Sequence, residues 1–166
     1  MMRARRVRPG PGQESVWEYP RPPVVTPETR TIEVVFGGLT VALTTRALRV
    51  LETGHAPVYY IPLEDVQPGV LASGDRLSYC DFKGEARYQH VIVGERCATE
   101  AAWLYATPRP GYEALVGHVA FYAGPMDRCL VGGEIATPQP GTFCSGWVTA
   151  DVVGPFIGEP GTLLTD

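Results

Sequence analysis

Short apolar runs alternate with glycine and proline along almost the whole chain, which has 19 glycines and 16 prolines in 166 residues. Runs rich in Val, Ile, Tyr, Phe and Thr and bounded by turn residues are typical of strands. Segments 31–36 and 39–44 flank a Gly-Gly pair, and two glycines accept the positive φ angles of tight hairpin turns. Segments 47–53 and 58–62 are predicted to form a second hairpin, although 47–53 fits a helix or a strand on pattern alone.

Segment 84–94 ("GEARYQHVIVG") shows the clearest alternation. As a strand it places its even-numbered positions on one face and its odd-numbered positions on the other. The first face holds Ala86, Tyr88, His90 and Ile92, and the second holds Arg87, Gln89, Val91 and Val93. Further strands are predicted at 76–80, 99–107, 118–124 and 128–136. Segment 63–75 is predicted to be a loop or a short helical turn, and 108–117 a turn with one helical turn.

These strands indicate one mostly β domain of antiparallel strands with short helical turns only. We predict a disordered basic tail at 1–13, a single β domain at 14–162 and a short tail at 163–166. Within the domain, 136–162 has little periodicity and is predicted to be an irregular C-terminal strap. Its aromatic residues are expected to pack onto the body; they are Phe143, Trp147 and Phe156.

Charge and hydropathy narrow the classes of partner. The net charge of −4 argues against nucleic acid, because a phosphate-binding face normally carries a basic surplus. No run reaches the 18 or so apolar residues that a membrane helix needs, and no apolar segment follows the N-terminal arginines as in a signal peptide. We therefore expect a cytoplasmic protein without a membrane or nucleic-acid partner, and a homodimer stays open.

The cysteines do not suggest a metal site. Cys80, Cys97, Cys129 and Cys144 are far apart, and none forms the close pair that structural zinc sites use. We expect no structural zinc, no other cofactor, and cysteines that act as small buried apolar residues.

Lys83, in "SYCDFKGEARY", is the only lysine among 14 basic residues. Arginine keeps its proton, whereas lysine can serve as a nucleophile or as a compact charge, so this position is a candidate for chemistry. Two plain readings stay open: a composition that depletes lysine everywhere, and a surface lysine paired with Asp81 or Glu85.

Tyrosine and tryptophan supply candidate walls for a binding site, because each combines an apolar ring with a polar group. Tyr59 and Tyr60 are neighbours on one predicted strand, so only one of them can line a given cleft. We select Tyr60, Tyr88 and Trp103 as walls with Tyr105 beside them, and Arg46 as a second cation. His55, His90 and His118 are scattered, and their spacing does not require a metal.

Four segments carry a resemblance to a known family: "VLETGHAPVYYIP", "CDFKGEARY", "EAAWLYATPRPGYEALVGHVAFY" and "WVTADVVGPF". Together they resemble a family of bacterial and fungal proteins called domain-of-unknown-function family 427, over roughly residues 14 to 162. The family's central motif reads Cys-x-Trp-Lys-Gly-x-Ala-x-Tyr. Cys80, Lys83, Gly84, Ala86 and Tyr88 match it, whereas Phe82 replaces the usual tryptophan and His118 stands where the family often has tyrosine.

The resemblance implies a β-tent-like fold, in which two antiparallel sheets meet at an angle around a cleft. Relatives of that fold often hold a zinc ion with paired cysteines, which this sequence lacks, so neither the zinc nor a reductase activity is expected here. The family is sometimes labelled a nucleotidyltransferase, but we find no Gly-Ser motif followed by Asp-x-Asp.

Three hypotheses about function result. The first is a small-molecule-binding domain with a planar ligand, either neutral or anionic. The residues expected to contact this ligand are Lys83, Tyr60, Tyr88, Trp103, Tyr105, Arg46 and His118. The second is an enzyme that uses Lys83 and a tyrosine of the same cleft for imine, acid–base or nucleotidyl-transfer chemistry. The third is a protein-interaction module with exposed aromatic residues.

Overall fold

Strands dominate the structure, a computed structural model that describes residues 5–141 and 145–162. They make up 48% of it and single 3-10 turns another 6%, so the prediction of a mostly β domain is confirmed. The N-terminal strands are β1 (Glu14–Ser15), β2 (Val24–Glu28), β3 (Ile32–Phe36), β4 (Leu39–Thr44), β5 (Ala47–Leu51) and β6 (Val58–Pro62). The central strands are β7 (Leu71–Cys80), β8 (Gly84–Val93), β9 (Arg96–Leu104) and β10 (His118–Phe121). The last strands are β11 (Arg128–Val131), β12 (Glu134–Ile135), β13 (Thr137–Pro138), β14 (Trp147–Val148) and β15 (Val152–Val153). The helical turns are η1 (Val16–Glu18), η2 (Leu63–Asp65) and η3 (Glu113–Leu115).

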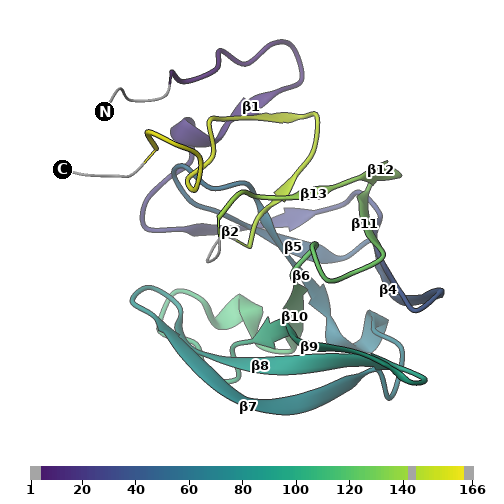
Figure 1. The fold of residues 1–166 in the computed structure, drawn as a ribbon. Coiled ribbons are helices and arrows are strands. Elements are labelled where there is room, and N and C mark those ends of the chain that lie inside the picture. Colours follow the sequence, from purple (N-terminus) through teal and green to yellow (C-terminus); the bar gives the residue numbers. More distant parts are fainter. Residues whose placement is uncertain (1–4, 142–144, 163–166) are drawn as a thin grey trace.

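Two antiparallel sheets form the body. The larger has seven strands in the order β2-β5-β6-β10-β9-β8-β7, and the smaller has four in the order β12-β11-β3-β4. The long hairpin of β7 and β8 lies at the end of the molecule opposite β1 (Figure 1). Two small pairs lie outside these sheets: β1-β15 joins the N-terminal segment to the C-terminal strap, and β13-β14 lies within the strap.

Local sequence explains most of the hairpins. Gly37 and Gly38 have φ angles of 62° and 75°, and they join β3 to β4 as predicted. β5 pairs with β6 in antiparallel register, which confirms the second predicted hairpin and settles 47–53 as a strand. The helical turns η2 and η3 fall inside the two segments where short turns were expected.

One boundary prediction was wrong. Segment 63–75 was expected to be a loop or a short turn throughout, yet β7 already begins at Leu71. Leu71 pairs with Val91 of β8, and the register shifts between Ser73 and Leu77. The long partner strand β8 therefore extends the ladder through polar residues, and a bulge accommodates the irregular stretch.

The central strands of the large sheet are buried on both faces, and successive side chains of a strand point in opposite directions. On β6, Tyr59 and Ile61 join the main core, which also contains Ile32 and Val34 of the smaller sheet. Tyr60, between them, joins a second cluster that is rich in aromatic residues. The prediction that Tyr59 and Tyr60 cannot share a cleft is confirmed.

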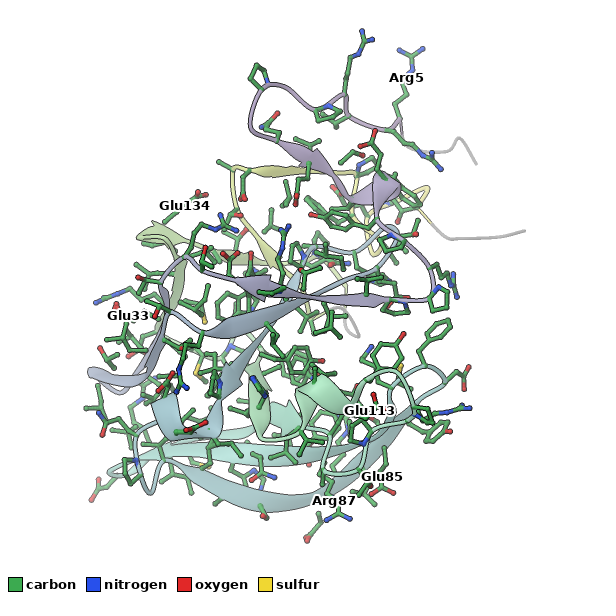
Figure 2. The ribbon with its side chains drawn as sticks, turned by 180° about the vertical axis from the view of Figure 1, so that it is seen from behind. Arg5, Glu33, Glu85, Arg87, Glu113 and Glu134 are labelled. Carbon is green, nitrogen blue, oxygen red and sulfur yellow. The ribbon has the colours of Figure 1, made fainter. Side chains whose placement is uncertain are left out.

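In the first half of β8, the same alternation places successive side chains in the protein interior and in solvent. Ala86 and Tyr88 belong to the aromatic cluster. Glu85 and Arg87, between and beside them, point away from the ribbon into solvent (Figure 2).

The C-terminal strap packs onto the body through its aromatic residues, as expected. Trp147 is 1% exposed, its ring centroid lies 5.2 Å from that of Tyr59, and its indole Nε1 donates to the Phe121 carbonyl at 2.9 Å. Phe156 packs in a smaller cluster with Val16 and Val152. Phe143 lies outside the described residues.

The described part of the N-terminal segment contacts the same strap, although we predicted a disordered tail over 1–13. The Val7 amide donates to the Gly154 carbonyl at 2.8 Å, and Gln13 Nε2 donates to the Ala150 carbonyl at 2.9 Å. Residues 1–4 and the predicted tail at 163–166 lie outside the described part of the chain.

The cysteines differ from one another in exposure. Cys129 is buried as expected, and burial raises the pKa of its thiol to about 12. Cys80 is half-buried and Cys97, next to the β8–β9 turn, is exposed, so the expectation of burial was wrong for Cys97. Cys144 is not among the described residues. Over residues 5–141 and 145–162, no helix is long and apolar enough to cross a membrane.

We expect Trp147→Ala to lower the free energy of unfolding by about 3–5 kcal/mol, because it removes a fully buried ring and leaves a cavity between the sheets. Urea denaturation measures this loss. The matched control is Ile135→Ala on β12, where the side chain is 60% exposed and a change within about 0.5 kcal/mol is expected. Equal stability of the two variants would show that the strap contributes nothing to the core.

Candidate functional site

Lys83 occupies the three-residue turn between β7 and β8. Cys80 pairs with Gly84 across this turn, and Gly84 has φ of 104°, a conformation that favours glycine. Arg109 fixes the turn from a neighbouring loop: its amide donates to the Lys83 carbonyl at 2.9 Å and its guanidinium to the Asp81 carbonyl at 2.7 Å. These constraints hold the Lys83 side chain inward, where the residue is only 9% exposed.

Lys83 lines a pocket of about 180 Å³, which we call the Lys83 pocket. Its other side chains with polar groups are Glu52, His55, Tyr60, Trp103 and Tyr105. Ser145 and Gly146 of the strap also line it. The ammonium nitrogen of Lys83 lies 5.9 Å from the centre of the Tyr105 ring, within the range of a cation–π contact.

The aromatic wall is tightly connected. Trp103 Nε1 donates to the Tyr60 hydroxyl at 3.3 Å, and the two rings meet edge to face with centroids 6.4 Å apart. The ring centroid of Tyr105 lies 6.4 Å from that of Tyr60. Burial raises the pKa of both tyrosines far above the ordinary value, so their hydroxyls keep their protons at neutral pH. The wall therefore offers neutral hydroxyl groups to a ligand.

Gln139 of the strap orients His55. Its Oε1 accepts from the Ala56 amide at 2.8 Å, so Nε2 is the atom that faces the Ile157 carbonyl at 2.9 Å and His55 Nδ1 at 3.2 Å. An amide nitrogen only donates, so His55 Nδ1 accepts and the proton of the neutral ring sits on Nε2. The strap thus sets the tautomer of a histidine in the pocket wall.

Burial lowers the pKa of His55 below its ordinary value. The negative charge of Glu52 opposes this change, and the positive charges of Lys83 and Arg21 add to it. Among the residues that the structure describes, no carboxylate forms an ion pair with Lys83. The alternative of a surface pair with Asp81 or Glu85 is not found among these residues, and Glu85 pairs with Arg87 at 3.3 Å.

The structure brings four of the seven predicted site residues together: Lys83, Tyr60, Trp103 and Tyr105 line one pocket. Tyr88 lines the adjoining cleft instead. Arg46 lies elsewhere, 58% exposed in its side chain and paired with Asp65 at 3.0 Å.

His118, on β10, lies outside both cavities, and its Nδ1 contacts the Val116 carbonyl at 3.1 Å. Because a carbonyl only accepts, His118 Nδ1 is the donor in that contact.

Three residues of the site were not selected from sequence: Glu52, His55 and Gln139. Glu52 and His55 lie in "LETGHAP", inside one of the segments that carry the family resemblance, but nothing in their spacing relates them to Lys83. Gln139 comes from the irregular strap, where the sequence has no periodicity from which the direction of a side chain could be predicted. Within the described ranges, no three His, Cys, Asp or Glu side chains are grouped so that they could hold a metal ion.

Comparison with known families matches residues 24–132, more than half of the chain, to the family described as Domain of unknown function (DUF427). The chain belongs to this family. The matched region contains Glu52, His55, Lys83 and the aromatic wall, whereas the DUF427 match ends before Gln139 and Ser145 of the strap. No curated protein matches the chain.

We expect the His55 imidazole to titrate below its ordinary pKa of about 6.5 in an NMR pH titration. The unfolded chain takes up this proton nearer pH 6.5, so His55 lowers native-state stability as the pH falls through that interval. Lys83→Met removes a positive charge and should raise the pKa of His55, whereas Glu52→Gln should lower it further.

Arg46→Met is the control for this titration, because Arg46 is a cation outside the pocket. A pKa of His55 that responds equally to Lys83→Met and Arg46→Met would contradict the arrangement of charges in the Lys83 pocket.

Proposed function

We propose that this DUF427 protein binds a small polar organic molecule in the Lys83 pocket. The observation that supports this most is a lysine, largely withdrawn from water, to which no carboxylate within the described residues is paired. A buried charge that makes no ion-pair contact is costly, so an anionic or carbonyl oxygen of a ligand would stabilise it.

The other walls narrow the chemistry of the ligand. Tyr60, Trp103 and Tyr105 favour a flat or partly apolar group against their rings. Glu52 would accept a hydrogen bond from a hydroxyl or amine group of the same ligand, and the Nε2–H of His55 would donate one. The volume of about 180 Å³ suits a compact group and is below the usual size of drug-like sites.

A thermal-shift screen of small carboxylates, aldehydes and nucleotides tests this proposal. A ligand at about 100 times its Kd should stabilise the native state by about 2.7 kcal/mol, which raises Tm by several degrees. We expect Lys83→Met to abolish the shift, because the variant keeps the length of the stem and removes the charge. Arg46→Met, which removes an exposed cation, should leave the shift unchanged.

A shift that persists in Lys83→Met would contradict the proposed role of Lys83. No shift with any of the three ligand classes would argue against small-molecule binding and favour a protein-interaction module instead.

A second candidate function is catalysis in the same pocket, because groups suited to proton transfer flank the amine. Glu52 would take a proton from the Lys83 ammonium, and the His55 Nε2–H would polarise a carbonyl oxygen. The amine nitrogen would then bond to the carbonyl carbon and give up its two protons to the carbonyl oxygen, which would leave as water as a C=N double bond replaces the C=O bond.

Trapping with sodium borohydride distinguishes catalysis from binding alone. If the imine forms, a small aldehyde such as glyoxylate should become fixed to the chain as a secondary amine, with one adduct per chain by mass spectrometry. Because Lys83 is the only lysine, Lys83→Met should leave no side-chain adduct, and peptide mapping separates any labelling of the N-terminal amine. Equal labelling of both proteins at the N-terminus alone would contradict imine chemistry at Lys83.

A further inference from the structure

A second, larger cleft adjoins the Lys83 pocket. It has a volume of about 630 Å³ and is lined by Tyr79, Tyr88 and Tyr122, so we call it the tyrosine cleft. Ser145 and Gly146 of the strap line both cavities. The two cavities are therefore neighbours that share one edge.

The partition between them is aromatic. Trp103 lines the Lys83 pocket and Tyr122 lines the tyrosine cleft, and their ring centroids are only 4.5 Å apart. Tyr88, which also lines the cleft, is held by a hydrogen bond of 3.0 Å between its hydroxyl and Ser78 Oγ. The rings of Tyr88 and Tyr122 are thus fixed in position before any ligand arrives, which lowers the entropic cost of binding.

Arg76 completes the cleft with a flat cation. Its guanidinium carbon lies 4.6 Å from the centre of the Tyr88 ring. Its Nη1 forms an ion pair with Glu100 Oε2 at 3.5 Å. Arg76 lies in the irregular stretch of β7 between Ser73 and Leu77, and bulges of this kind re-aim side chains. The bulge that interrupts the ladder therefore places Arg76 over the aromatic wall of the cleft.

We propose that the tyrosine cleft is a second subsite, which binds a planar ring belonging to the molecule whose polar head occupies the Lys83 pocket. This inference rests on the proposed function of the Lys83 pocket. Flat rings stack on tyrosine and on guanidinium planes, and the other lining residues of this cleft include Gly124, Pro125 and Pro138, which add no charge to it. The ligand class is an organic anion that carries an aromatic ring on a short tether.

A series of carboxylates tests the second subsite: acetate, benzoate, phenylacetate and 3-phenylpropanoate, titrated calorimetrically into the full chain. Acetate reports on the Lys83 pocket alone. We expect the member whose tether fits the shared edge to bind at least about tenfold more tightly than acetate, which is the gain that one stacked ring supplies. Tyr122→Leu should remove this gain.

Tyr79→Ser is a second variant that does not endanger folding, because Tyr79 is 65% exposed, and it should reduce the gain as well. Arg76→Met has a matched control in Arg96→Met. Arg96 likewise lies over an aromatic ring, at 4.5 Å from Phe36, and pairs with a carboxylate at 3.1 Å, but it is outside the cleft. Only Arg76→Met should weaken binding of the aryl probes.

The outcomes separate the two proposals. If acetate binds in a Lys83-dependent manner and no aryl probe binds more tightly, the second subsite is overturned and the proposed function stands. A gain that survives Tyr122→Leu and Tyr79→Ser overturns the second subsite as well. If aryl probes bind through Tyr122 but are insensitive to Lys83→Met, a single ligand that spans both cavities is overturned together with the proposed role of Lys83.

Discussion

The alternation of side chains across the seven-stranded sheet is the constraint on which the rest of the structure depends. Because the central strands of this sheet are buried on both faces, β6, β9 and β10 each contribute to two separate interiors. Tyr59 of β6 packs on Trp147 in the main core, and its neighbour Tyr60 forms part of the aromatic wall of the Lys83 pocket. A shift of one residue in the register of β6 would exchange them and destroy the core and the pocket together.

Strand existence could be predicted from sequence because the signals are local. The Gly37-Gly38 turn and the alternation in 84–94 report directly on backbone geometry, and both hold in the structure. The start of β7 could not be predicted, because Leu71 and Ala72 join the ladder only through their partners on β8. Pairing between distant segments overrides the polar composition of 63–75 there.

The residues of the candidate site likewise fall into those that could be predicted from sequence and those that could not. Lys83, Tyr60, Trp103 and Tyr105 were found because residue chemistry and strand parity select them. Arg46 was selected for its charge, but Asp65 satisfies that charge at the surface. Glu52, His55 and Gln139 reach the pocket through tertiary packing of a turn and of an irregular strap, and no periodic pattern encodes that approach.

Gln139 connects Ala56, His55 and the Ile157 carbonyl through one amide group. The strands that hold Lys83 and the aromatic wall are synthesised before Gln139 and Ile157 leave the ribosome. The tautomer of His55 is therefore set only when the strap docks. The proton arrangement of a pocket whose charged and aromatic walls lie inside the DUF427 match thus depends on a segment that lies outside the part of the chain matched to that family.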